Sequence, residues 1–181
     1  MAMPITIPRF TVDDLDQFPD DGNRYELVDG VLLVTPSPGA PHQVIAARIT
    51  TALSNFLAPY PEFLVASPGV VVKRPRNQLE PDVLVFRAPT GELDWENVRE
   101  NLLAVEVTSR STRVYERVYK RPAYLALGVK EVWQVERRKR QVLVSRPDAP
   151  ADVIYSETVT WRPPGVETDF VLVIGDILRG L

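Results

Sequence analysis

The stretch "NLLAVEVTS", residues 101–109, is an apolar run with one carboxylate, Glu106, near its centre. A continuous run of this kind is typical of a strand that is covered on both faces of a sheet. A glutamate is seldom fully buried unless it is paired or binds a metal, because an unpaired charge is costly there. The run therefore predicts a central strand, with a second group nearby that answers the charge of Glu106.

The composition of the whole chain limits what it can be. Its 181 residues suit a single domain over residues 1–181, and 45% hydrophobic with 25% charged residues is ordinary for a soluble globular protein. The absence of cysteine excludes disulfides, thiolate metal sites and cysteine nucleophiles. It also suits a reducing compartment, so we expect a cytoplasmic protein.

Neither the ends nor the net charge suggest a membrane or a general affinity for nucleic acid. The N-terminus lacks the basic region and apolar core of a signal peptide, and no run is long enough to span a bilayer. We therefore expect no membrane partner. The net charge of −3 gives no overall attraction to nucleic acid, although a local basic face would be sufficient for binding.

Alternating and helical patterns divide the chain into short elements. Asp29-Gly30 favours a hairpin turn between two strand-like runs. An amphipathic helix is indicated by apolar residues at roughly helical spacing, namely Val44, Ala47, Ile49, Leu53 and Leu57. Helices are expected at 11–18, 41–57 and 111–127, and strands at 24–28, 31–35, 62–67, 69–74, 81–86, 101–107, 131–136 and 141–146. Further strands around 159–161 and 170–174 are expected to complete the sheet. This order predicts a mixed α/β sandwich.

Asp82 and Glu106 are the first pair of candidate catalytic residues. Asp82 follows Pro81 at the start of a strand, and it shares a face with the apolar residues two and four positions on. If the two strands are neighbours, the carboxylates converge and offer the oxygen ligands that Mg²⁺ prefers. The alternatives are a turn residue at a strand start for Asp82, and a buried ion pair with an arginine for Glu106.

Lys120 is the third candidate, in the helical pattern that follows Glu106. Glu116 and Tyr124 lie four residues to either side of it, on one helical face. A lysine beside two carboxylates could orient an attacking water or offset phosphate charge. The alternative is a solvated ion pair between Lys120 and Glu116.

Basic residues near these positions offer a route to a nucleic-acid partner. Lys73 and Arg74 precede the Pro-Asp pair, and Arg113 and Arg117 share one face of the predicted helix. These two groups could line a groove for a phosphate backbone. The run "RRKR", residues 137–140, lies in a predicted hairpin turn and is interpreted as a soluble loop.

Several segments together resemble a known family. In chain order they are "RYELVDGVLLVTPSPGAPHQ", "EPDVLVF", "AVEVTSRST", "YERVYKRPAYLALGV" and "EVWQVE". They are similar to the Uma family of restriction-endonuclease-like proteins, which belongs to the PD-(D/E)XK nuclease superfamily. The resemblance runs from about Arg24 to Glu136, and its several separate motifs make it specific.

The resemblance implies a restriction-endonuclease-like αβββαβ core over about 24–136, with a mixed sheet and added β-hairpins. It implies that Asp82 and Glu106, on adjacent strands, bind Mg²⁺ or Mn²⁺, and we expect the backbone carbonyl of Val107 to help. The superfamily usually has lysine two residues after the glutamate, where this chain has Thr108. In the Uma family that lysine has moved to the following helix, where Lys120 matches the motif.

Three further residues match family positions or depart from them. Glu26 could extend the acidic cluster, or it could be a solvent-facing strand residue. His42 could relay a proton or contact phosphate, or it could be an ordinary residue at the start of a helix. Glu116 stands where the family more often has aspartate, so the extra methylene could change any role it has.

The sequence therefore predicts a metal-dependent endonuclease that hydrolyses phosphodiester bonds in DNA, with RNA as another candidate substrate. A homodimer is expected because double-strand cutters need two sites. The alternative is a catalytically inactive member of the fold that binds nucleic acid or acts as a dimeric interaction module. Thr108, in place of lysine, and the acidic net charge favour that alternative.

Overall fold

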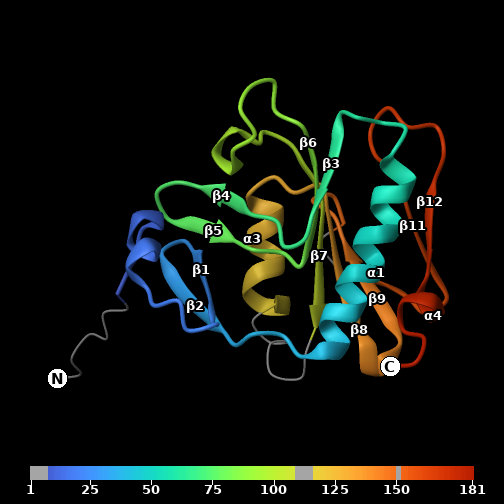
Figure 1. Cartoon of the computed structure of the whole chain (residues 1–181), viewed down its shortest axis with the longest axis horizontal. Coiled ribbons are helices and arrows are strands. Elements are labelled where there is room, and N and C mark those ends of the chain that lie inside the picture. The colour runs from blue at the N-terminus through green and yellow to red at the C-terminus, as the bar shows by residue number, and fades with distance from the viewer. Residues whose placement is uncertain (1–7, 109–115, 150–151) are drawn as a thin grey trace.

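A six-stranded mixed sheet forms the centre of the computed structural model, which describes residues 8–108, 116–149 and 152–181 (Figure 1). The strands lie in the order β10-β9-β8-β7-β6-β3, and only β7 and β8 run parallel to each other. Their bounds are β3 (Phe63–Ala66), β6 (Val83–Arg87), β7 (Asn101–Thr108), β8 (Glu131–Glu136), β9 (Gln141–Ser145) and β10 (Val153–Tyr155). The run that contains Glu106 is thus a central strand, as predicted.

A second sheet of four strands lies beside the first, in the order β2-β1-β5-β4. Its strands are β1 (Arg24–Val28), β2 (Val31–Thr35), β4 (Val71–Lys73) and β5 (Asn77–Leu79). The predicted hairpin is confirmed, because Asp29 and Gly30 both have positive φ, at 46° and 77°, as its two-residue turn requires. The run at 69–74 contributes β4 to this smaller sheet rather than to the central one.

The prediction that the last two strands complete the central sheet is wrong. β11 (Thr158–Trp161) and β12 (Phe170–Val173) pair only with each other within the described residues. β11 alternates strictly between exposed threonines and the buried side chains of Val159 and Trp161. This pattern suits a half-buried ribbon that lies on an apolar face, whereas a strand inserted in the sheet would be covered on both sides.

The buried face of the longest helix, α1, contains Ile49, Leu53 and Leu57, as expected, but not Val44 and Ala47. Ile45, Ile49 and Leu53 are fully buried, whereas Val44 is 37% exposed and Ala47 is exposed as well. Val44 and Ala47 lie outside the stripe that Ile45, Ile49 and Leu53 form at four-residue spacing. The helices are the 3₁₀ helices η1 (Val12–Gln17), η2 (Trp95–Asn97) and η4 (Arg137–Lys139), the π-helix η3 (Glu116–Lys120), and α1 (Ala40–Leu57), α3 (Arg121–Ala126) and α4 (Ile174–Ile177).

The central sheet is covered on both faces, and each covering layer forms its own core. α1, β11, β12 and α4 lie on one face, and α3 with the smaller sheet lies on the other (Figure 1). Along β7, Leu103 and Val105 belong to the core on the α1 side, and Ala104 belongs to the core on the α3 side. Because side chains alternate along a strand, Glu106 faces α3.

The fold is therefore mixed α/β, as predicted, with added hairpins around the central sheet. Within the described ranges, no helix has the length and apolar character needed to cross a bilayer.

Candidate active site

Two neighbouring strands bring Asp82 and Glu106 together. β6 and β7 are antiparallel and pair Val83 with Val105, so Asp82, just before β6, lies next to Glu106. Both side chains are buried, with Asp82 5% and Glu106 2% exposed. The backbone N–H of Val107 donates a hydrogen bond of 2.8 Å to Oδ2 of Asp82. The expected convergence of the two acids is thus present.

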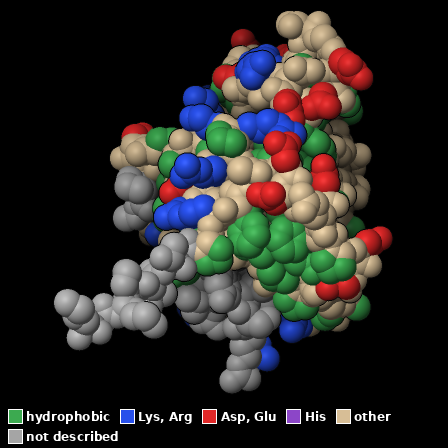
Figure 2. Space-filling model, turned by 90° about the vertical axis from the view of Figure 1, so that its left-hand side faces the viewer, with side chains coloured by type: hydrophobic (Ala, Val, Ile, Leu, Met, Phe, Trp, Pro, Cys, Tyr) green, Lys and Arg blue, Asp and Glu red, His purple; other side chains and the backbone are tan. Residues whose placement is uncertain are grey.

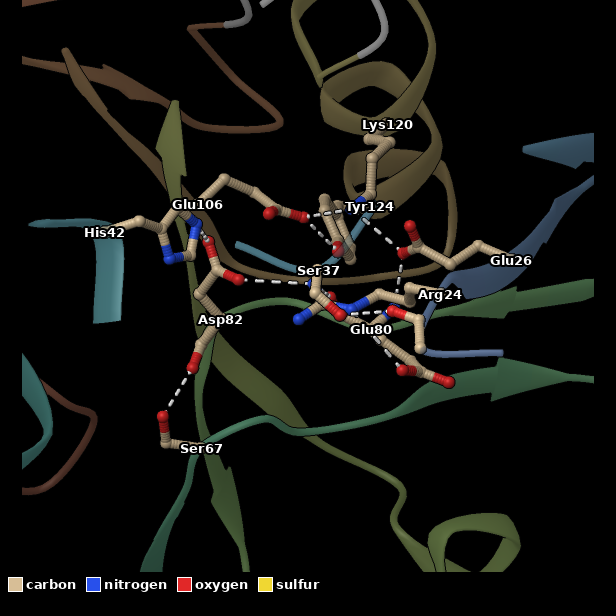
Figure 3. Close-up of polar contacts among 11 residues, drawn as sticks. Arg24, Glu26, Ser37, His42, Ser67, Glu80, Asp82, Glu106, Lys120 and Tyr124 are labelled. Carbon is tan, nitrogen blue, oxygen red and sulfur yellow. Dashed lines mark hydrogen bonds and ion pairs between the residues drawn. The ribbon is translucent and has the colours of Figure 1, made fainter. Parts of the chain in front are cut away.

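Lys120 reaches the same place from the helical layer on the face of the sheet to which Glu106 points. Its Nζ lies 2.7 Å from Oε1 of Glu106 and 2.9 Å from Oε1 of Glu26, and Figure 3 shows it between the two acids. The side chain of Lys120 is only 3% exposed. The alternative of a solvated pair with Glu116 is therefore wrong, because Lys120 is buried against two other carboxylates.

The local backbone explains how Lys120 points inward. It ends the π-helix η3, and α3 follows at once with Pro122 in its first turn. A single π turn is frequent at functional sites, and Pro122, which cannot donate a backbone hydrogen bond, favours an irregular helical turn where η3 meets α3. One turn later, the hydroxyl of Tyr124 donates a hydrogen bond of 2.6 Å to Oε1 of Glu106.

Glu26 lies in the smaller sheet and is fully buried, so the alternative of a solvent-facing residue is wrong. Its Oε1 accepts a 2.7 Å hydrogen bond from the backbone N–H of Glu80 and also contacts Lys120. Its Oε2 is buried and has no hydrogen-bond partner within the described residues. A buried carboxylate oxygen without a partner is costly, so this oxygen is available to a cation or a water.

His42 and Arg24 both contact Asp82. Nε2 of His42, in the first turn of α1, lies 2.9 Å from Oδ2 of Asp82, while its Nδ1 is buried without a partner within the described residues. Nη1 of Arg24 lies 3.2 Å from Oδ1 of Asp82 and donates a 2.9 Å hydrogen bond to the carbonyl of Glu80. His42 therefore orients a candidate catalytic acid and does more than begin a helix.

Sequence reasoning missed Arg24 as a member of this cluster and gave Tyr124 and Glu80 no role. Nε of Arg24 lies 3.6 Å from Oε2 of Glu80, which places Glu80 at the edge of the site. Arg24 and Glu26 are two residues apart on β1 and so share a face, which was a usable signal. Tyr124 is one helical turn from Lys120, and this spacing was the corresponding signal for it.

Burial and neighbouring charges shift the pKa values of the central groups in different directions. Burial raises the pKa of Glu106 from 4.5 to about 7, with Asp82 and Glu26 adding to the rise and Lys120 opposing it. Burial alone would raise the pKa of Asp82, but the hydrogen bond from His42 and the Val107 N–H lower it. Burial alone would lower the pKa of Lys120, but Glu106 and Glu26 raise it. Lys120 and Asp82 therefore stay charged at neutral pH.

The donor set suits a hard divalent cation that keeps several of its waters. Asp82 and Glu106 supply two carboxylates, and the carbonyl of Val107 is a third oxygen on the same strand as Glu106. No group of three or more acidic, histidine or cysteine side chains that could hold a metal occurs among the described residues. Mg²⁺ is commonly bound by only one or two carboxylates, with waters completing its shell. The residues present fit such an ion.

The predicted nucleic-acid-binding residues are not gathered into one basic surface. Arg74 pairs with Asp13 and Glu96, and Arg117 pairs with Asp152 at 2.9 Å. Lys73 is exposed at the end of β4. On the side of the smaller sheet, basic side chains are interspersed with acidic ones (Figure 2). Arg113 and the side chain of Glu116 lie outside the described residues.

Comparisons with known proteins give a family match and a similar solved structure. The model of the Uma2 family, described as "Putative restriction endonuclease", matches residues 12–175, a wider span than the core expected from the sequence. The fold is similar to the crystal structure of "a putative nuclease belonging to DUF820" from Anabaena variabilis, with a TM-score of 0.71 and 18% sequence identity. That likeness covers 93% of this chain and 97% of the other. No curated protein matches the chain.

Proposed function

The chain belongs to the Uma2 family, and on that premise we propose that it is a metal-dependent endonuclease that hydrolyses phosphodiester bonds in DNA. Family membership supports a nuclease function, and the metal requirement and the DNA substrate are our additions. The observation that carries the proposal is the buried Lys120, 2.7 Å from Glu106, whose neighbouring strand β6 is preceded by Asp82. A buried cation amid several acids, next to oxygen donors for a metal, is typical of a phosphoryl-transfer site.

Asp82, Glu106 and the carbonyl of Val107 would hold Mg²⁺ or Mn²⁺. When bound, such an ion polarises a phosphoryl oxygen and lowers the pKa of a bound water. Asp82 suits this role because its pKa is lowered and it stays anionic. His42 and the Val107 N–H, both on Oδ2, fix the orientation of this carboxylate.

Lys120 would position the attacking water and offset the charge that develops on the phosphoryl oxygens. Its raised pKa keeps it cationic, and burial strengthens its electrostatic effect because little water screens it. Glu26 and Tyr124 are positioning residues, since Glu26 holds the ammonium and Tyr124 holds the carboxylate that faces it. Arg24 links Asp82 to the smaller sheet.

The rival function is an inactive nuclease-fold protein that binds nucleic acid or acts as a dimeric interaction module. Thr108 favours this rival, because it occupies the usual position of the superfamily lysine. The contact between Lys120 and Glu106 supplies an ammonium from another element, and this supports the catalytic function. A homodimer remains part of the proposal, because cutting both strands needs two sites.

The proposal is tested by nicking of supercoiled plasmid DNA with Mg²⁺ or Mn²⁺. We expect Asp82→Asn and Glu106→Gln to lower the rate by about 100-fold or more, because each removes a charge on which the reaction depends. The matched control is Glu131→Gln, which also neutralises a buried glutamate, on β8, and should stay within about threefold of wild type. Equal rates for Glu106→Gln and Glu131→Gln would reject the assignment.

Two companion measurements separate the remaining alternatives. Calorimetric titration with Mg²⁺ should show weaker binding to Glu106→Gln than to wild type, and unchanged affinity would remove the metal from the proposal. The same cleavage assay on single-stranded RNA compares the two nucleic acids. Binding of DNA without cleavage under any metal condition would favour the inactive rival.

A further inference from the structure

A cavity of about 210 Å³ opens beside the candidate active site. His42 from α1 lines it, together with Val107 and Thr108 at the end of β7. The opposite wall comes from the turn between β8 and β9, whose residues Arg137–Lys139 also line the cavity. We call residues 137–140 the basic turn. Neither acid of the pair lines the cavity, but two lining residues, His42 and Val107, both bind Asp82.

The basic turn carries positive charge that its surroundings do not neutralise. Nζ of Lys139 lies 3.0 Å from Oε2 of Glu136, an acid that also accepts a 2.6 Å hydrogen bond from Gln141. Arg137 and Arg138 form no ion pair with any acid in the described part of the chain. Ten other arginines do, namely Arg9, Arg24, Arg74, Arg76, Arg87, Arg117, Arg121, Arg146, Arg162 and Arg179. Within the described residues, these two guanidinium groups are therefore without an acidic partner and could bind an anion at the cavity.

The turn is held by rigid elements, which a binding surface requires. Glu136 and Gln141 are partners across β8 and β9 of the central sheet. The backbone N–H of Arg140, which has a left-handed φ of 51°, closes the turn with a 3.1 Å hydrogen bond to the carbonyl of Arg137. The basic side chains are therefore presented from a fixed backbone, and the interpretation of "RRKR" as only a soluble loop overlooks this placement.

We propose that the cavity and the basic turn bind the phosphate backbone of duplex DNA next to the bond that is cut. The inference rests on the proposed function and names where its substrate is held. Arginine forks match phosphate oxygens, and contacts of this kind give affinity and register without reading sequence. Thr108, which lines the cavity, follows Glu106 by two strand residues, about 7 Å along β7, so the cavity begins close to the acids.

The test is DNA binding by the Arg137→Gln/Arg138→Gln double variant. Fluorescence anisotropy with a short duplex is measured in EDTA at several salt concentrations, so that cleavage plays no part. Each lost phosphate contact should lower the slope of log affinity against log salt by about 0.9, so we expect a decrease of about 1–2 and weaker binding at low salt.

The matched control is Arg99→Gln/Lys130→Gln. It removes the same charge from two exposed residues at the opposite end of β7 and β8, just before these strands begin. We expect its affinity and salt slope to stay near those of wild type. Equal binding by the two double variants, or a wild type that does not bind the duplex at low salt, would overturn the inference.

A failure of this inference can be distinguished from a failure of the proposed function. If Glu106→Gln cleaves as fast as wild type while Arg137→Gln/Arg138→Gln loses binding, the catalytic assignment fails and the docking site stands. If Glu106→Gln is inactive and the basic-turn variant binds like its control, only the docking site is lost. In cleavage assays, the basic-turn variant should raise KM with little change in kcat.

Discussion

The two ends of the parallel pair β7 and β8 each bury a glutamate, but the groups that contact the two glutamates differ. At one end, Glu131 is 5% exposed, and each of its oxygens has one partner, Trp133 Nε1 at 2.6 Å and Arg146 Nε at 2.7 Å. At the other end, Glu106 is 2% exposed and shares one ammonium with Glu26.

The difference shows that burial of an acid does not by itself mark a functional site. Burial raises the pKa of both Glu131 and Glu106. Within the described residues, several acids surround few cations at the Glu106 end. Glu26, one of these acids, has a buried oxygen without a hydrogen-bond partner there. An incompletely paired buried carboxylate, which structural ion pairs avoid because it is costly, distinguishes this end, whereas the buried unpaired atom at the start of β7 is the neutral amide oxygen of Asn101.

The largest expected effect is that of Lys120→Met on stability. The change leaves Glu26 and Glu106 buried and facing each other without a cation, which should lower the free energy of unfolding by about 3–5 kcal/mol. Urea unfolding in EDTA measures it. The control Lys139→Met removes a half-exposed partner of Glu136 at the same end of the sheet and should cost below about 1 kcal/mol.

The loss in Lys120→Met should shrink on acidification. The pKa of Glu106 is already raised to about 7, and removing the ammonium raises it further. A carboxyl whose pKa is higher in the folded than in the unfolded state stabilises the fold as the pH falls toward the unfolded value. A loss that is the same at pH 8 and pH 6 would contradict this account of the cluster.

Two glycines, Gly69 near Asp82 and Gly128 shortly before β8, give a second comparison of the two ends of the β7 and β8 pair. A Cβ on Gly69 would lie 2.3 Å from Cβ of Leu84, and the Gly69 N–H bonds the carbonyl of Pro81, next to Asp82. Gly69→Ala should therefore cost about 3 kcal/mol and also lower activity by moving Asp82. Gly128 has a φ of +92° but open space around it, so Gly128→Ala should cost about 1 kcal/mol with activity intact. Thermal unfolding and plasmid nicking together check both.

The smallest expected effect is the coupling between Glu131 and Arg146. The Arg146 side chain is 36% exposed, so solvent screens the pair and a double-mutant cycle with glutamine should give about 0.5 kcal/mol. The same cycle for Glu106 and Lys120 should give a value several times larger, because both groups are buried. Equal coupling energies in urea unfolding would remove the distinction between the two ends.

Much of the site could be predicted because its signals are local. An acid inside the apolar run of β7 requires a partner, and the run after Pro81 places Asp82 at the start of the neighbouring strand. Lys120 was assigned from the family resemblance rather than from its spacing, since the helical pattern equally allowed a surface pair with Glu116. Its contact with Glu26 depends on how the smaller sheet packs on α3, which no local pattern encodes.

By itself, the amino-acid sequence determined most of the strands, helix α1, the absence of thiol chemistry and the identity of the central acids, whereas it did not predict β5 or β10. These follow from periodicity and residue type, which act over a few residues. Only the tertiary structure decided that β11 and β12 form a separate ribbon, that Arg24 and Tyr124 join the acids, and that the basic turn lines a cavity beside them. Those outcomes depend on which distant surfaces pack together, because burial and pairing are properties of the assembled chain.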